Sequence, residues 1–178
     1  MTRSQSPRPT AAQWSVEPTE VDHPEARAVL RAYLTELVAR YHGRPAGADE
    51  VAAALAAEPA EGLAVLLLAR HRGAVSGCIG LRRLGPALGE VTKVYVRPGA
   101  RGLGGGARLL AEVERAARQR GMTVLRLGTR ADLVEARALY ARHGYREIPR
   151  YHDDPYEDHW FEKRLPPVTG GVTRPAAS

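Results

Sequence analysis

The sequence predicts one domain of the mixed α/β (α+β) class. Segments in which apolar residues recur at helical spacing alternate along the chain with short apolar runs that are typical of strands. The chain has 178 residues, of which 44% are hydrophobic and 26% are charged, and this is enough material for one buried core. A mixed central sheet flanked by helices is the architecture that this order of elements favours.

The first half of the domain is expected to hold three strands and two helices. Asp22 and Glu25 have the spacing of a helix capping box, and Gly43 is a suitable residue to end that helix. A second, alanine-rich helix should end before Pro59, because the residue before a proline disfavours helical geometry. The expected strands are 14–17, 63–69 and 74–84, and the expected helices are 22–42 and 49–57.

The second half continues with a strand that ends near Pro98, a glycine-rich turn and a helix that Gly121 closes. Asp132 and Glu135 repeat the capping spacing and predict the start of a further helix. The expected strands are 90–96, 123–127, 145–148 and 159–163, and the expected helices are 104–120 and the segment that carries Leu139 and Tyr140. We expect the folded domain to cover residues 13–165, with disordered tails at 1–12 and 166–178.

Composition argues against several classes of protein. Cys78 is the single cysteine, so no intramolecular disulfide can form, and we interpret it as a small buried strand residue rather than a nucleophile. No segment has the roughly 20 apolar residues of a membrane helix, and residues 1–10 lack the apolar region of a secretory signal. A cytoplasmic protein without a membrane partner or a metal cofactor is therefore expected.

The formal net charge of +6 comes from arginine, since Lys93 and Lys163 are the only lysines. The basic residues are spread along the chain, whereas a nucleic-acid-binding protein usually concentrates them on one face. We therefore predict no nucleic-acid partner. The charge itself is compatible with a merely basic surface and with attraction of an anionic ligand.

A glycine-rich turn follows the strand that ends at residues 96–98. Glycines 102, 104, 105 and 106 lead into a helix, whose first N–H groups lack partners within the helix and lie at its positive end. Glycine lets a phosphate approach this backbone without a Cβ clash. Arg97, Arg101 and Arg108 add positive charge nearby. The turn therefore predicts a pyrophosphate-binding cradle, and the alternative is a glycine-rich turn that only connects a strand to a helix.

Two common phosphate-binding motifs do not fit this turn. A Walker A loop needs a lysine followed by serine or threonine, and no lysine is present here. A dinucleotide-binding fingerprint follows the first strand of a βαβ unit, whereas two predicted helices and several strands precede this turn.

Two motifs in the expected order give a resemblance to the GNAT family of N-acetyltransferases, in particular to a bacterial subgroup whose acceptor is uncertain. Arg101-x-x-Gly104-x-Gly106 resembles the family's acetyl-CoA loop. Ala138-Leu139-Tyr140-x-x-x-Gly144-Tyr145 resembles its second hallmark, one strand and one helix later. The resemblance covers about residues 16–165. It implies a mixed sheet with splayed central strands and transfer of an acetyl group from acetyl-CoA to an amine.

The resemblance also implies how acetyl-CoA is held. Backbone amides of the loop bind the CoA pyrophosphate, and the strand before the loop pairs through its backbone with the pantetheine arm. An N–H of that strand also polarises the thioester carbonyl. The residues that match these roles are Val94, Tyr95 and Val96 on the strand and Arg101, Gly102, Leu103, Gly104, Gly105, Gly106 and Ala107 in the loop and first helical turn.

Two side chains are the candidate catalytic groups. Tyr140 matches the family tyrosine beside the CoA sulfur, where a modestly lowered phenol pKa would let it protonate the leaving thiolate. The alternative is a core tyrosine in register with Leu133 and Ala136. Glu90 matches the glutamate that serves as general base in histone-acetylating members. Period-2 alternation is expected to place Glu90 on the same face of its strand as Val96. The alternative for Glu90 is an edge or solvent-facing strand residue that pairs with an arginine.

The acceptor is expected to be a primary amine of a small molecule or a protein, and the oligomeric state is left open between a monomer and a homodimer. His152, Asp153 and Asp154 lie in a polar loop that would border the acceptor site. Two positions depart from family patterns: Leu133 replaces an asparagine, and Gly128 replaces the glutamate of ribosomal-protein acetylases. The alternative function is an acyl-CoA-binding or sensing domain without turnover.

Overall fold

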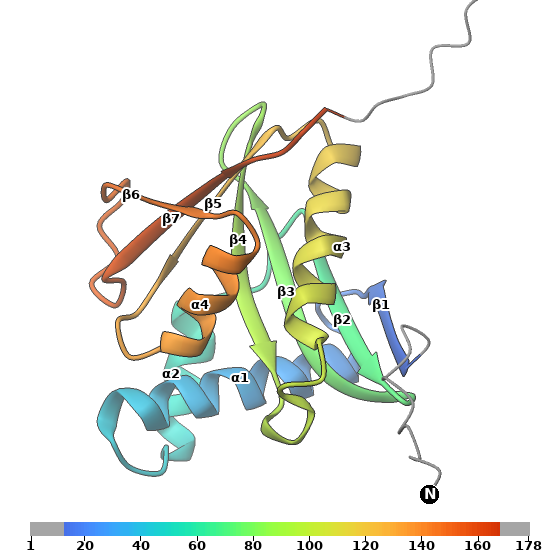
Figure 1. The fold of residues 1–178 in the computed structure, drawn as a ribbon. Helices are drawn as coiled ribbons and strands as arrows, with labels where there is room; N and C mark the ends of the chain where they lie inside the picture. The colour runs from blue at the N-terminus through green and yellow to red at the C-terminus, as the bar shows by residue number, and fades with distance from the viewer. Residues whose placement is uncertain (1–12, 168–178) are drawn as a thin grey trace, which may run out of the picture.

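The computed structural model describes residues 13–167, so the two predicted tails lie almost entirely outside the described part of the chain. Seven strands form one sheet in the order β1-β2-β3-β4-β5-β7-β6, and four α-helices pack on it (Figure 1). The strands are β1 (Trp14–Pro18), β2 (Val65–His71), β3 (Ala74–Arg83), β4 (Leu88–Val96), β5 (Val124–Thr129), β6 (Arg146–Ile148) and β7 (His159–Arg164). The helices are α1 (Pro24–His42), α2 (Ala48–Ala57), α3 (Gly105–Gln119) and α4 (Val134–Arg142), with a short 3-10 turn at Pro98–Ala100.

The sheet is mixed, as the sequence predicts. Every neighbouring pair is antiparallel except β4 and β5, which run parallel because α3 carries the chain back between them. The expected elements are all present, with ends shifted by a few residues. No helix in residues 13–167 is long and apolar enough to cross a membrane.

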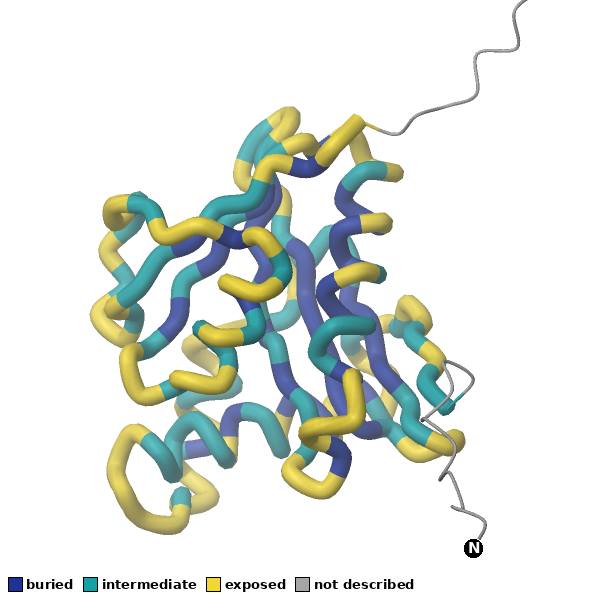
Figure 2. The backbone as a smooth tube through the Cα atoms, in the orientation of Figure 1, coloured by how far each residue is buried: buried dark blue, intermediate teal, exposed yellow. Residues whose placement is uncertain are grey.

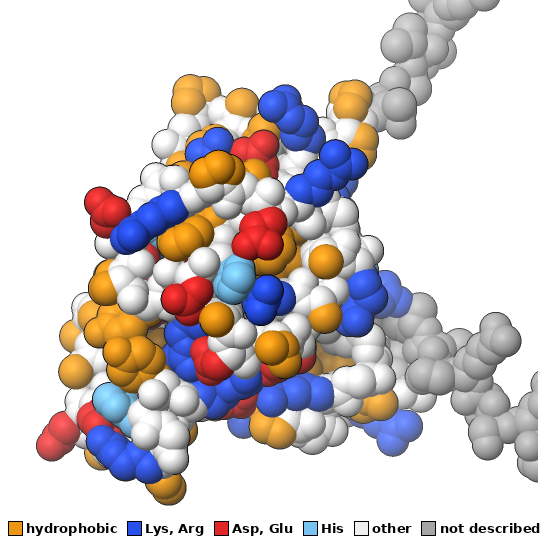
Figure 3. All heavy atoms as spheres, turned by 60° about the vertical axis from the view of Figure 1, so that its left-hand side comes forward, with side chains coloured by type: hydrophobic (Ala, Val, Ile, Leu, Met, Phe, Trp, Pro, Cys, Tyr) orange, Lys and Arg blue, Asp and Glu red, His pale blue; other side chains and the backbone are white. Residues whose placement is uncertain are grey.

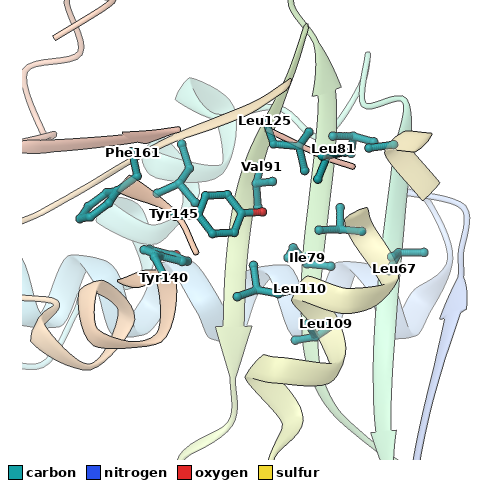
Figure 4. Packing of buried hydrophobic residues seen from close by; sticks show 14 of the residues in the cluster. Leu67, Ile79, Leu81, Val91, Leu109, Leu110, Leu125, Tyr140, Tyr145 and Phe161 are labelled. Carbon is teal, nitrogen blue, oxygen red and sulfur yellow. The ribbon is translucent and has the colours of Figure 1, made fainter. Parts of the chain in front are cut away.

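Helices cover both faces of the sheet, and each face has its own core (Figures 1 and 2). The larger core lies under α3 and α4 and includes Ile79, Leu81, Leu109, Leu110 and Leu125 (Figure 4). The smaller core lies under α1 and includes Val29, Leu66, Leu68, Cys78 and Tyr95. We refer to these as the α3 face and the α1 face. The exposed backbone in Figure 2 is concentrated in the loops and on the outer sides of the helices.

Cys78 is fully buried on β3, as the sequence predicts. Burial raises the pKa of its thiol to about 12, so the thiol stays protonated at neutral pH. A protonated, inaccessible thiol is a poor nucleophile, which agrees with a structural role for this residue.

Candidate active site

The sheet opens between β4 and β5. These two strands pair only at their beginnings, where Leu88, Gly89 and Glu90 lie opposite Val124, Leu125 and Arg126. Beyond Glu90 the strands diverge, as Figure 1 shows, and the side of β4 that faces β5 has no ladder partner there. This is the splay that the resemblance implied. We refer to this divergence of β4 and β5 as the opening, and it is the candidate site for the reaction.

A β-bulge in β4 changes which side chains face each side of the sheet. The register with β3 shifts between the pairs Gly80–Thr92 and Cys78–Tyr95, so β4 holds one extra residue there. The backbone of Lys93 in this segment has φ 54°, which is unusual for a residue other than glycine. Its side chain is buried and its Nζ donates a hydrogen bond to the Glu58 carbonyl oxygen at 2.9 Å.

The bulge overturns one prediction. Strict alternation would place Glu90 and Val96 on one face of β4, but the extra residue reverses the alternation between them. Val94 and Val96 pack against the α3-face core, whereas Tyr95 lies in the α1-face core. Glu90 pairs across the strands with Arg82 and shares the α1 face with Tyr95.

The glycine-rich loop has the backbone geometry that its sequence indicates. Gly102 (φ 76°) and Gly104 (φ 88°) adopt the left-handed conformation, and Gly104 is the N-cap of α3. Gly105 and Gly106 are required for packing instead: a Cβ at Gly105 would lie 2.4 Å from the Trp14 ring, and one at Gly106 would lie 2.9 Å from Leu139. The first amides of α3, from Gly105 to Ala107, have no acceptor within the helix and mark its positive end.

Side chains from two distant elements, Trp14 of β1 and Glu36 of α1, hold this loop. The Trp14 indole N–H on β1 donates to the Leu103 carbonyl at 2.8 Å. Arg101 donates through Nε to the Val96 carbonyl at 2.8 Å and through Nη2 to both Glu36 carboxylate oxygens of α1 at 2.7 Å. Arg101 therefore links the end of β4 to α1, which is a bracing position for the loop rather than a free cation.

Tyr140 lies on α4, is 4% exposed and belongs to the α3-face core. Its ring lies 6.0 Å from the Tyr145 ring and 5.9 Å from the Phe161 ring, centroid to centroid (Figure 4). Burial raises the pKa of the Tyr140 hydroxyl above its ordinary value, and the negative charge of Glu157 raises it further. The expectation of a modestly lowered pKa is therefore wrong, because the hydroxyl is surrounded by apolar groups and faces a carboxylate.

Glu90 lies at the point where β4 and β5 part, and several polar groups from other elements surround its carboxylate. Arg82 on β3 donates to Oε2 at 3.1 Å, and the Tyr151 hydroxyl donates to Oε1 at 3.0 Å. His152 Nε2 is 3.5 Å from the same Oε1. Glu90 is buried rather than solvent-facing, but it does pair with an arginine, Arg82, as the alternative interpretation expected.

The loop from residue 149 to residue 158 covers the α1 face beside the opening. His152 contacts Glu90, as above, whereas the Asp153 side chain is 97% exposed and pairs only with Arg150 among the described residues. Asp154 accepts a hydrogen bond from the Tyr156 amide within the loop. The end of the loop is fixed to β5 by the Asp158 amide, which donates to the Thr129 carbonyl at 3.0 Å.

Glu157 in this loop is a polar site residue that the sequence analysis did not identify. A Cβ on Gly128 of β5 would lie 1.6 Å from Glu157 Oε2, so the carboxylate occupies the space above this glycine. His152 Nε2 is 3.2 Å from Oε2, although the geometry is too poor for a hydrogen bond. Burial raises the pKa of Glu157 to about 7, and the charges of Asp154 and Glu90 contribute. The sequence signal was a glycine inside a strand, which often marks the close approach of another group.

The charged residues on the side of the molecule that carries α4, β6 and β7 are mixed in sign. Figure 3 shows Lys and Arg interspersed with Asp and Glu over this face rather than gathered into one basic patch. Among the described residues, no group of three or more His, Cys, Asp or Glu side chains is arranged to hold a metal ion.

The sequence matches the acetyltransferase (GNAT) family over residues 8–145, which is more than half of the chain. This protein belongs to the GNAT family. The motif order, the glycine loop and the splayed sheet now have one common explanation, because they are found together in this family as the resemblance implied.

Relatives of this GNAT protein include an IAA acetyltransferase from Azospirillum brasilense, which is 40% identical over 81 residues, or 44% of this chain and 52% of the relative. The chain spans about half the length of the curated relatives that it matches. A Klebsiella pneumoniae structure named as an acyl-CoA N-acyltransferase is 29% identical, with a TM-score of 0.67 over 86% of this chain and 99% of that one. A GNAT acetyltransferase from Elizabethkingia anophelis with acetyl-CoA bound shares the fold at 17% identity and a TM-score of 0.61, over 86% and 99% of the two chains.

Proposed function

We propose that this protein is a cytoplasmic N-acetyltransferase that moves the acetyl group of acetyl-CoA directly to a primary amine of a small molecule or a protein. Family membership supports the reaction class. The observation that carries the proposal is the position of the glycine loop at the N-terminus of α3, directly after the strand that lines the opening in the sheet.

In this proposal the pyrophosphate of CoA binds the backbone amides from Gly102 to Ala107. Anions bind well at such a helix start, because free N–H groups and the positive end of the helix dipole point at them. The pantetheine arm lies in the opening and pairs with the backbone of Val94, Tyr95 and Val96, whose β5 side lacks a ladder partner. Arg101 contributes by fixing the loop to Val96 and Glu36.

Tyr140 and Glu90 divide the proton transfers in the proposed mechanism. Tyr140 reaches the opening from the α3 face and protonates the CoA sulfur as the C–S bond breaks. Glu90 reaches it from the α1 face and is the carboxylate toward which the proton of the amine moves. Tyr140 packs in the α3-face core and Glu90 lies on the α1 face, which suits a donor and an acceptor that enter from opposite sides.

The test is release of free thiol from acetyl-CoA in the presence of spermidine, L-lysine or kanamycin, with mass detection of the acetylated amine. We expect thiol release that depends on the amine and one acetyl group on the product. An acyl-CoA sensor would instead be stabilised thermally by acetyl-CoA through mass action and would release no thiol with any amine, and that result would refute the proposal.

A further inference from the structure

The carboxylate of Glu157 has a position in the fold that the proposed reaction has not used. It comes from the loop between β6 and β7, far along the chain from Glu90, yet it lies over Gly128 of β5 on the α1 face. Arg126, the residue opposite Glu90 in the register, is two positions before Gly128 on the same strand. Glu157 and Glu90 are therefore neighbours across the narrow end of the opening, with His152 Nε2 at 3.2 Å from one carboxylate and 3.5 Å from the other.

The polar atoms around Glu157 are incompletely paired. Glu157 Oε2 and the Trp160 indole N–H are both buried, and among the described residues neither has a hydrogen bond of full geometry. Trp160 pairs with Gly128 in the ladder, and a weak hydrogen bond from its indole lowers the pKa of Glu157. The Glu157 carboxylate still has room for a further donor, because an ionised carboxylate accepts several hydrogen bonds. Glu90 differs, because Arg82 and Tyr151 already donate hydrogen bonds to it.

The surroundings favour a proton-accepting role for this carboxylate. The charged or titratable groups that face it are Glu90 of β4, Glu58 after α2, and Asp154 and His152 of its own loop. The hydroxyls of Tyr33 on α1, Tyr140 on α4 and Tyr151 in the loop also lie within its electrostatic influence. Carboxylates outnumber cations around it, so a positively charged ammonium group is attracted there.

We infer that Glu157 takes the proton directly from the acceptor ammonium ion, and that Glu90 receives it afterwards, on the path through His152 to solvent. This inference rests on the proposed function. A pKa near 7 suits a general base that works at neutral pH, because the carboxylate is then available while the proton transfer remains favourable.

The proton balance follows from these positions. The ammonium group gives one proton to Glu157 and becomes a neutral amine, whose nitrogen attacks the thioester carbonyl. The new C–N bond forms and the C–S bond breaks, with the Tyr140 proton passing to the sulfur. The amide nitrogen gives its surplus proton back to the Tyr140 phenolate through water. Glu157 then releases its proton through His152 and Glu90 to solvent, so that one proton leaves for each acetyl group transferred.

Gly128 allows a test that moves the carboxylate without removing it. A Cβ at residue 128 conflicts with the carboxylate end of Glu157, which is a flexible side chain that can turn aside. Gly128→Ala should therefore fold while displacing Glu157, and Glu157→Gln removes the base at its site. Glu147→Gln is the matched control, because Glu147 is exposed on β6 and its ladder partner Phe161 belongs to the α3-face core.

The experiment measures kcat/KM for thiol release between pH 5.5 and 9, with spermidine, L-lysine and kanamycin as acceptors, in the wild type and these variants. We expect Glu157→Gln to lower kcat/KM at neutral pH by roughly 10²–10⁴-fold, the range for a positioned base, and to remove the acidic limb of the profile. Acetyl-CoA affinity measured by calorimetry should be unchanged. Gly128→Ala should also lower kcat/KM, and the double variant should be no slower than Glu157→Gln, because both changes remove one interaction.

Several results would overturn the inference. Wild-type rate and an unchanged acidic limb in Glu157→Gln would do so while leaving the proposed function intact. Full activity in Gly128→Ala would also overturn the inference and leave the proposed function intact. This variant alone decides whether Glu157 is the base if Glu157→Gln does not fold. A loss in Glu147→Gln equal to that in Glu157→Gln would show a general charge effect. Absence of thiol release by the wild type with all three amines would refute the proposed function itself.

Discussion

Replacing Tyr140 with phenylalanine separates the chemical role of its hydroxyl from the packing role of its ring. The residue is 4% exposed, and its ring packs against Tyr145 and Phe161 in the α3-face core. Phenylalanine keeps these ring contacts. A typical hydrogen bond contributes about 1 kcal/mol to stability, so Tyr140→Phe should change the free energy of unfolding by no more than about that amount.

The effect on turnover should be much larger. Loss of a positioned proton donor lowers the rate by roughly 10²–10⁴-fold, which corresponds to about 2.7–5.5 kcal/mol of transition-state free energy at 1.36 kcal/mol per tenfold change. Burial raises the pKa of the Tyr140 hydroxyl, so the group stays protonated across the working pH range. A phenol that stays protonated over this range can donate its proton to the leaving sulfur.

The assay combines single-turnover thiol release, calorimetry with acetyl-CoA and thermal unfolding for the wild type and Tyr140→Phe. We expect a large fall in kcat, unchanged affinity for acetyl-CoA and a nearly unchanged melting temperature. Because the pKa of Tyr140 is raised, no loss of wild-type activity from its ionisation should be seen as the pH rises to 9. Full activity in Tyr140→Phe would refute the acid role and return the residue to the core alone.

Two further variants test the cofactor site and the buried acid. Ala107→Glu places a negative charge in the first turn of α3, where glutamate is compatible with the helix. It should weaken acetyl-CoA binding by more than roughly tenfold, because the carboxylate repels the pyrophosphate. The control Ala107→Gln should bind acetyl-CoA nearly normally, and equal affinities of the two variants by calorimetry would contradict the loop assignment. Because the folded pKa of Glu157 is raised to about 7 from 4.5, wild-type stability should decline as the pH rises through this interval. Glu157→Gln should therefore have a higher melting temperature than the wild type at pH 8 and no such gain at pH 4.5, and a gain that does not depend on pH would contradict the shifted pKa.

The order and type of the elements could be predicted because apolar periodicity and glycine or proline breaks are local signals. The direction of the side chains along β4 could not be predicted from such local signals. A single extra residue near Lys93 reverses the alternation between Glu90 and Val96. The bulge is a property of the pairing between β3 and β4, and period-2 counting along one strand carries no information about it.

The two predicted capping boxes are wrong for a different physical reason. Asp22 and Glu25 have capping-box spacing, but the N-cap is His23, and Glu25 binds Arg70 of β2. Asp132 and Glu135 have the same spacing, yet Leu133 is the N-cap of α4, and these carboxylates bind Arg130 and Arg40. In a chain rich in arginine, ion pairs with both nearby and distant arginines compete with local caps for the same carboxylates.

Glu157 shows how much of a site depends on contacts between distant segments. Its loop position carries no motif, and only the packing over Gly128 reveals why β5 contains a glycine between Leu127 and Thr129. The glycines of the proposed cofactor loop could be predicted from a local pattern, and the structure requires them through positive φ at Gly102 and Gly104 and close packing at Gly105 and Gly106. The proposed acceptor side combines single residues on β4, on the covering loop and after α2, so no stretch of sequence contains it.

The bulge and the splay together determine how the two halves of the proposed reaction meet. The splay removes the ladder partner of β4 beyond Glu90, which leaves backbone groups available to a ligand that lies in the opening. The bulge lies within this same segment and turns Tyr95 toward the α1 face while Val94 and Val96 stay on the α3 face. In a continuous, regular sheet, paired strands would separate Tyr140 on one face from Glu157 on the other. The charge of Glu157 acts on the hydroxyl of Tyr140, and the proposed mechanism places the thioester between them, with the acid on one face and the amine on the other.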